Sequence, residues 1–135
     1  MSVIEFEGKK PKIHPSVFLA PGSWVIGDVT LGEDVNIWTN AVVRGDDDTV
    51  VIGARTTVLE NCLIEAPTGN PVDIGEDVII SHGATVHGAT VEAGCIVGIG
   101  AIVLDNARIG AKSIIGSGAL VSPRTERSEE HTSEL

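Results

Sequence analysis

Aliphatic side chains recur at every sixth residue along most of this chain, and this spacing restricts the folds that it can adopt. The first run of the repeat comprises Ile13, Leu19, Val25, Leu31, Ile37 and Val43. A period of six fits neither an α-helix nor a hairpin strand that alternates every second residue. It is typical of a parallel β-helix, in which three short strands make one triangular coil and each coil stacks on the previous one. Because each coil takes about 18 residues, the segment 13–124 is long enough for about six coils, and we predict one all-β domain.

Two polar segments interrupt the repeat and shift its phase. Residues 44–51 read RGDDDTVV, and residues 65–73 read EAPTGNPVD. Both are rich in charged residues or turn formers, so we expect them to bulge out of the coils as loops.

Composition limits the class of partner. With 135 residues, of which 42% are hydrophobic, the chain is long enough for one domain with a sizeable core. The net charge of −10 argues against nucleic acid or an anionic membrane surface as a partner. The start of the chain lacks the pattern of a secretion signal, and no apolar run approaches the roughly 20 residues that span a bilayer. We therefore expect a cytoplasmic protein with reduced, buried thiols at Cys62 and Cys95.

Two histidines in the segment ISHGATVHG, residues 80–88, are candidate metal ligands because imidazole nitrogen is a common ligand of zinc. Counting along the repeat places Arg44, Glu65 and His87 on one face in successive coils, about 4.8 Å apart. His82 falls on another face. One chain therefore does not easily bring His82 against Glu65 and His87.

A neighbouring subunit can supply the missing ligand. If prisms associate around a threefold axis, one edge offers Glu65 and His87 while the adjoining subunit offers His82, at three identical interfaces. Three protein ligands with an open fourth position are the arrangement of a catalytic zinc site. A surface ion-pair ladder of Arg44, Glu65 and His87, which contributes little energetically, is an equally good interpretation of the positions alone.

Three stretches of the chain carry a family resemblance. They are IHPSVFLAPGSWVIGDVTLGEDVNIW, AVVRGDDDTVVIGARTTVLENCLIE and VDIGEDVIISHGATVHGATVEAGCIVGIGAIVLDNARIGAKSIIGSGALVSP. On these motifs the chain resembles the γ-class carbonic anhydrases, which are left-handed β-helix proteins, and the resemblance extends to about Thr125. It implies a homotrimer that binds Zn²⁺ or Fe²⁺ between subunits. The metal activates a water molecule, which attacks CO₂ to give bicarbonate.

The resemblance also implies roles for individual residues. Two of the three metal-binding histidines of the family match His82 and His87, and the third position is Glu65. The arginine and aspartate of the family's VRGD motif match Arg44 and Asp46, which implies an ion pair between subunits that helps to move protons or bicarbonate.

Three positions depart from the family pattern. Glu65 can still bind zinc, but an anionic ligand lowers the net charge on the metal, so the bound water should be less acidic than in an all-histidine site. Leu59 replaces a glutamine that holds this water, and a leucine side chain forms no hydrogen bond. Glu60 replaces an aspartate, and with Arg44 and Asp46 it completes our set of catalytic candidates. Weak or absent CO₂ hydration is therefore expected.

Two other functions stay open at this point. Hexapeptide-repeat acyltransferases share the fold and use a histidine base beside a coenzyme A groove, and fold alone does not assign function. A trimeric scaffold without chemistry is the third candidate. Binding of coenzyme A would favour the first of these, and binding of neither metal nor coenzyme A would favour the second.

The last nine residues break the repeat. The segment RSEEHTSEL, residues 127–135, matches the translation of a common sequencing-library adapter, so we interpret it as an artefactual tail and place the β-helix domain at residues 1–126. His131 is therefore not counted as a ligand. In the resembling family a C-terminal helix follows this point, so we expect the chain to be truncated and to lack that helix.

Overall fold

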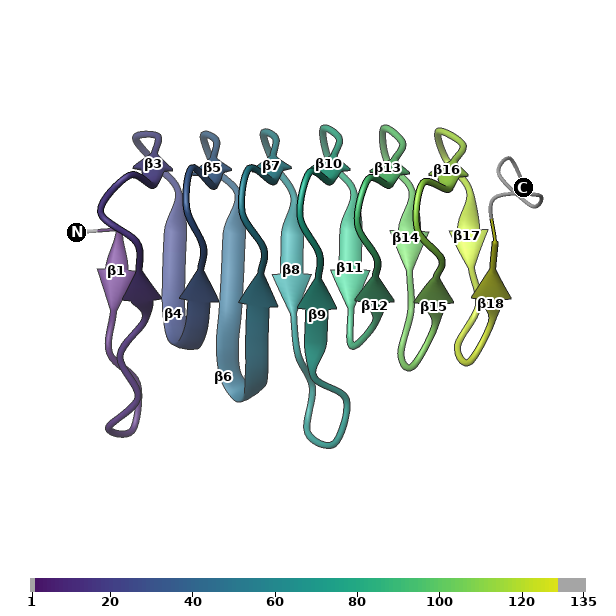
Figure 1. Cartoon of the computed structure of the whole chain (residues 1–135). Coiled ribbons are helices and arrows are strands. Elements are labelled where there is room, and N and C mark those ends of the chain that lie inside the picture. The colour runs from purple at the N-terminus through teal and green to yellow at the C-terminus, as the bar shows by residue number, and fades with distance from the viewer. Residues whose placement is uncertain (1, 129–135) are drawn as a thin grey trace.

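A computed structural model describes residues 2–128 as one row of stacked parallel strands (Figure 1). The stack is a left-handed β-solenoid of about seven turns, which confirms the fold predicted from the six-residue spacing and the family resemblance. The sequence count of about six coils started at Ile13, whereas strand pairing already begins at Val3, opposite Val25. No helix long and apolar enough to cross a bilayer occurs among residues 2–128.

The solenoid has three faces, named the β10, β11 and β12 faces after one strand of each. The β10 face contains β3 (Phe18–Leu19), β5 (Asn36–Ile37), β7 (Thr57–Val58), β10 (Ile79–Ile80), β13 (Ile96–Val97) and β16 (Ile114–Ile115). The β11 face contains β1 (Val3–Ile4), β8 (Leu63–Glu65), β11 (Thr85–His87), β14 (Ile102–Val103) and β17 (Leu120–Val121). The β12 face contains β2 (Lys12–Ile13), β9 (Val72–Ile74), β12 (Thr90–Val91), β15 (Arg108–Ile109) and β18 (Glu126–Arg127). The long strands β4 (Trp24–Leu31) and β6 (Val42–Ile52) pass from the β11 face to the β12 face.

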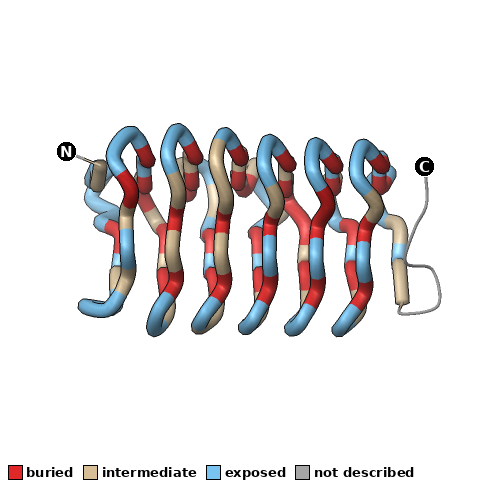
Figure 2. Tube along the Cα trace, turned by 90° about the horizontal axis from the view of Figure 1, so that it is seen from above, coloured by how far each residue is buried: buried red, intermediate tan, exposed pale blue. Residues whose placement is uncertain are grey.

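The core is a continuous column of small and medium aliphatic side chains. One side chain of a typical strand points inward and its neighbour points out, so Ile80, Val86 and Val91 are fully buried and come from the three different faces. Buried positions recur along every turn in Figure 2, whereas exposed positions gather at the outer bends. Cys62 and Cys95 are buried free thiols within this column, as the sequence predicts.

Tight turns with a left-handed residue connect many of the strands. Asp34, Asn61 and Asn106 have positive φ angles of 57°, 65° and 61°, a conformation that Asn and Asp adopt more readily than other non-glycine residues. Asp34 lies between β4 and β5, Asn61 between β7 and β8, and Asn106 between β14 and β15, so such turns occur at all three corners of the solenoid. The residue just before the left-handed position has the same place within each of these turns.

The expected loop at residues 44–51 is wrong as a backbone assignment, because β6 runs through it. β6 pairs with β4 on both sides of a bulge, where the register shifts between Gly27 and Val29. The strands approach closely here: a Cβ on Gly27 would come within 2.6 Å of the carbonyl oxygen of Gly45. The second expected loop does leave the coil, as residues 66–71 between β8 and β9, and it protrudes at the bottom of Figure 1.

The expected tail lies mostly outside the described residues. Arg127 pairs in register with Ile109, so the ladder includes at least one residue beyond the expected domain end at 126. Residues 129–135, including His131, are not among those described. The interpretation of the tail as an artefact stays a prediction.

Candidate metal centre

A column of charged side chains runs along the corner between the β11 and β12 faces. Arg44, Glu65 and His87 lie in register on β6, β8 and β11, as the count along the repeat predicts. Nη1 of Arg44 is 3.4 Å from Oε1 of Glu65, and the same oxygen is 3.9 Å from Nε2 of His87. Asp105, in the turn after β14, extends the column because its carboxylate contacts Nδ1 of His87. Basic and acidic groups therefore alternate along four successive coils.

Arg44 and Asp46 form a two-point ion pair within one chain. Nε and Nη2 of Arg44 donate to the two carboxylate oxygens of Asp46 at 3.2 and 2.9 Å. The hydrogen bond to Asp46 raises the pKa of Arg44, and the hydrogen bond from Arg44 lowers the pKa of Asp46. The family resemblance implies such a pair between subunits, whereas here the two partners are two residues apart on β6 and contact each other.

His82 lies at the opposite corner, between the β10 and β11 faces. It occupies the turn that follows β10, and its Nδ1 atom is 2.8 Å from Oε1 of Glu60 in the preceding coil. The side chain of His82 is 54% exposed, which leaves its outer nitrogen open to solvent or to another subunit. Glu60, a catalytic candidate from the sequence, is thus in contact with a candidate metal ligand.

The described part of one chain does not bring the predicted ligands together. His82 lies in the turn before β11 and His87 is the last residue of β11, so the two histidines lie at opposite corners of the β11 face. No group of three or more His, Cys, Asp or Glu side chains that could hold a metal ion occurs in residues 2–128. Glu65 and His87 are adjacent, and His82 lies at the other corner of the β11 face, in contact with Glu60.

Glu65 and His87 nevertheless fit one half of a zinc site. Two ligands of a tetrahedral zinc ion, each about 2.0 Å from the metal, are about 3.3 Å apart. The observed 3.9 Å between Oε1 of Glu65 and Nε2 of His87 is close to that separation. Because Arg44 contacts the same carboxylate oxygen, a metal ion at this position would share Glu65 with a guanidinium group.

Asp105 is not among the residues predicted from the sequence, although a signal for it exists. Leu104–Asn106 reads Leu-Asp-Asn and Leu59–Asn61 reads Leu-Glu-Asn, and in both the last residue has a positive φ angle. The carboxylate of each tripeptide stands at the same turn position and contacts Nδ1 of a histidine in a neighbouring coil. Leu59 itself, the position of the family's glutamine, offers only carbon atoms beside Glu60.

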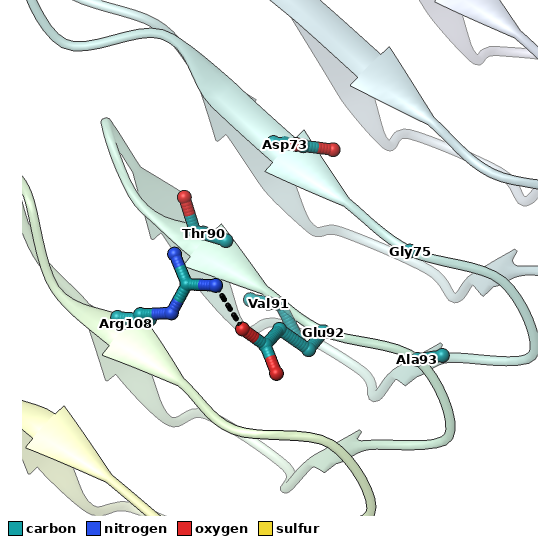
Figure 3. Close-up of a pocket in the computed structure, with 7 residues that line it drawn as sticks. All are labelled: Asp73, Gly75, Thr90, Val91, Glu92, Ala93 and Arg108. Atoms are coloured by element: carbon teal, nitrogen blue, oxygen red, sulfur yellow. Dashed lines mark ion pairs between the residues drawn. The ribbon is translucent and has the colours of Figure 1, made fainter.

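Shallow hollows in the described part of the surface include one away from the candidate site and one beside it. One is on the β12 face (Figure 3), where Arg108 forms an ion pair with Glu92. It is lined by Asp73, Gly75, Thr90, Val91, Glu92, Ala93 and Arg108. The other adjoins the candidate site, because Asp46 is one of its lining residues. The rest of its lining is Lys9, Asp28, Gly45, Asp47, Asp48 and Thr49.

Comparison with known proteins gives named relatives, although no family model matches the chain. The chain is 36% identical to "Gamma carbonic anhydrase 2, mitochondrial" of Arabidopsis thaliana over 123 residues, which cover 87% of this chain and 44% of that protein. It is 38% identical to "Carbonic anhydrase" of Geobacillus kaustophilus over 108 residues, which cover 80% of this chain and 59% of that protein. The chain therefore spans about half the length of the curated relatives that it matches.

A solved structure agrees with the fold over almost the whole chain. A Bacillus cereus protein assigned as an acetyltransferase superimposes with a TM-score of 0.92 at 35% identity, covering 93% of this chain and 73% of that one. The named relatives and the left-handed β-solenoid both agree with the resemblance found in the sequence. The chain belongs to the γ-class carbonic anhydrase-like family of hexapeptide-repeat, left-handed β-helix proteins.

Proposed function

We propose that the chain assembles into a homotrimer that catalyses metal-dependent, reversible hydration of CO₂ to bicarbonate at sites shared between subunits. The observation that carries the proposal is the arrangement of the two histidines at opposite corners of the β11 face, with Glu65 3.9 Å from Nε2 of His87. In this proposal Glu65 and His87 of one subunit and His82 of its neighbour hold Zn²⁺ or Fe²⁺. Relatives named as carbonic anhydrases support it.

The residues around the metal position have distinct tasks in this proposal. A bound divalent metal supplies the Lewis acid that makes water nucleophilic near neutral pH. Arg44 places a positive charge beside the site, where it attracts bicarbonate and stabilises the anionic product. Its partner Asp46 stays ionised because its pKa is lowered, so it accepts protons only weakly near pH 7. Asp46 therefore orients Arg44 in this mechanism and does not serve as the base.

Mixed assembly of two variants is a direct test of a site shared between subunits. His82→Ala and His87→Ala each remove one ligand, so each variant alone should lose zinc binding and CO₂ hydration. When the two are unfolded and refolded together, about a quarter of the interfaces should combine an intact His87 edge with an intact His82 edge. Zinc content and hydration activity should return to about that fraction of the unmutated protein.

His14→Ala is the matched control, because His14 is an exposed histidine that contacts Ser16. It should leave zinc content unchanged. Sedimentation velocity of the unmutated protein should give the mass of a trimer. The proposal is contradicted if the unmutated protein binds no zinc, or if the mixed assembly stays as inactive as the separate variants. A cytoplasmic location, expected from the sequence, also stays a prediction.

Acyl transfer is the second candidate function. It is supported by the likeness to the Bacillus cereus protein assigned as an acetyltransferase. In that case the trimer should bind coenzyme A in a calorimetric titration, and His82→Ala or His87→Ala should abolish acetyl transfer without any need for zinc. Absence of both zinc and coenzyme A binding would favour a scaffold without chemistry.

A further inference from the structure

We propose that Asp105 and Glu60 are positioning residues that fix the protonation pattern and orientation of His87 and His82. Each carboxylate holds the proton on Nδ1 of its imidazole, so that Nε2 is unprotonated and directed toward the metal position. The use of Nε2 as a metal ligand rests on the proposed function. The fixed imidazole pattern does not, and it can be measured without metal.

The hydrogen bonds between the carboxylates and the imidazoles determine which ring nitrogen carries the proton. Nδ1 of His82 is 2.8 Å from Oε1 of Glu60, and Nδ1 of His87 contacts Oδ1 of Asp105. An ionised carboxylate only accepts hydrogen bonds, so each Nδ1 must be the donor. In a neutral imidazole the other nitrogen then carries the lone pair. Both histidines are thus held in the same form by different parts of the chain.

The backbone places the two carboxylates in a similar way, because each stands at the same position within its tight turn. Glu60 precedes Asn61 and Asp105 precedes Asn106, and both asparagines have positive φ angles. Glu60 lies one coil before its histidine, 22 residues away, and Asp105 lies one coil after its histidine, 18 residues away. The turns aim the two side chains along the solenoid axis at neighbouring imidazoles.

The chemistry of metal ligands gives these contacts a purpose. A metal-binding histidine usually donates its other ring N–H to a carboxylate or carbonyl, which fixes its ring and makes it a stronger ligand. For His87, the free Nε2 faces Oε1 of Glu65 at 3.9 Å, which is the pair of donors already adjacent in one chain. A simple ion pair between exposed groups has no such requirement for which nitrogen is protonated.

His14 is an internal control with the opposite pattern. Its Nδ1 accepts a hydrogen bond from the backbone N–H of Ser16 at 3.1 Å, so its proton belongs on Nε2. Nitrogen-15 chemical shifts of the ring nitrogens distinguish the two forms. In metal-free protein at about pH 8, where an unperturbed imidazole is neutral, His82 and His87 should carry the proton on Nδ1 and His14 on Nε2.

Substitutions separate positioning from general stability. Asp105→Ala should convert His87 to a mixture of both forms and lower zinc affinity by about 10-fold to 100-fold in a competition titration. Asp105→Asn should keep the proton on Nδ1, because the amide oxygen still accepts, and should restore part of the affinity. Glu33→Ala, which changes the same turn position before Asp34, should alter neither measurement.

Two results would overturn the positioning role. One is a proton on Nε2 of His87 in the unmutated, metal-free protein. The other is an unchanged His87 spectrum and unchanged zinc affinity in Asp105→Ala. If instead the imidazole forms are as expected but the unmutated protein binds no zinc, the proposed metal chemistry fails while the carboxylate control of the histidines stands.

Discussion

Glu65 is the residue whose identity most affects the proposed chemistry. Its carboxylate lies between the guanidinium of Arg44 and the imidazole of His87, at 3.4 and 3.9 Å. An anionic ligand attracts the metal ion but leaves less positive charge on it to polarise water. Arg44 offsets part of the negative charge while competing for the same oxygen. The family's histidine has neither effect, so a neutral ligand at this position should favour catalysis.

We predict that Glu65→His together with Leu59→Gln raises kcat/KM for CO₂ hydration by about tenfold or more. The histidine leaves more charge on the metal, and the glutamine adds a hydrogen-bonding group that orients the attacking water. Stopped-flow hydration assays on zinc-loaded protein provide the measurement. Glu76→His is the control, because Glu76 is an exposed carboxylate paired with Arg55 elsewhere in the fold. Equal activity of the unmutated protein and the double variant would show that neither departure limits the rate.

The role of Glu60 illustrates what could not be predicted at the scale of single residues. The family resemblance placed Glu60 in the catalytic set, and the repeat places Glu60 and His82 in corresponding turns of neighbouring coils. Their contact, with Nδ1 of His82 2.8 Å from Oε1 of Glu60, also depends on the direction of two side chains that leave tight turns. The spacing of the inward aliphatic residues carries no information on that direction.

At the scale of the strand, two adjacent isoleucines show how little sequence each element needs. Ile79 and Ile80 make up β10, and their exposed fractions are 40% and 0%. The outward residue pairs with its neighbours along the sheet, and the inward one fills the shared core. The two isoleucine side chains of one strand therefore contribute differently to the stability of the fold.

We predict that Ile80→Ala lowers the free energy of unfolding by about 2–5 kcal/mol, because it leaves a cavity in a closely packed interior. Ile79→Ala, the matched control, should cost less than about 1 kcal/mol because much of its surface is already in water. Urea titrations followed by circular dichroism give both values. Similar costs for the two variants would contradict this assignment of inward and outward positions.

Most strands were predictable because the inward aliphatic repeats at a fixed interval. The exception is β6, whose central sequence RGDDDTVV has the composition of a turn. It stays extended because β4 makes a matching excursion and pairs with it on both sides of the bulge. Glycines at Gly27 and Gly45 permit that close approach. Pairing with β4 thus overrides the turn preference of this segment. The composition of the segment itself does not indicate that such a partner strand exists.

At the scale of the whole molecule, the strands of residues 2–128 pair with strands of the coils directly before and after them. β11, for example, pairs with β8 on one side and β14 on the other. In such a solenoid stability is approximately a sum of coil and nearest-neighbour terms. Coils with two neighbours are therefore held more firmly than coils with one.

We predict that backbone amide exchange is slowest in the central strands β8 and β11 and at least about tenfold faster in β17 and β18. The central amides open only when coils on both sides separate, whereas the last coil can open alone. Hydrogen–deuterium exchange with mass spectrometry measures this profile, with β13 expected to be intermediate. Uniform protection along the solenoid would show that it unfolds as one cooperative unit.

The complete candidate site was only partly predictable from the sequence, because some of its contacts depend on how the whole molecule is arranged. The in-register stack of Arg44, Glu65 and His87 follows from the repeat and is present in the structure. The position of His82 on a separate corner follows from the same count. Contacts made by Asp105 depend on the direction of a turn, and contacts between subunits depend on surfaces that no periodicity describes.

The loop of residues 66–71 has a consequence for how such a protein can change. It lengthens one coil directly after Glu65, yet Glu65 stays in register with His87 and Asp73 stays in register with Thr90. The number of residues in a coil can therefore change at this corner without moving the flanking strands along the solenoid axis. Evolution or protein engineering can vary the segment that borders the candidate site while the register of the candidate ligands Glu65 and His87 stays unchanged.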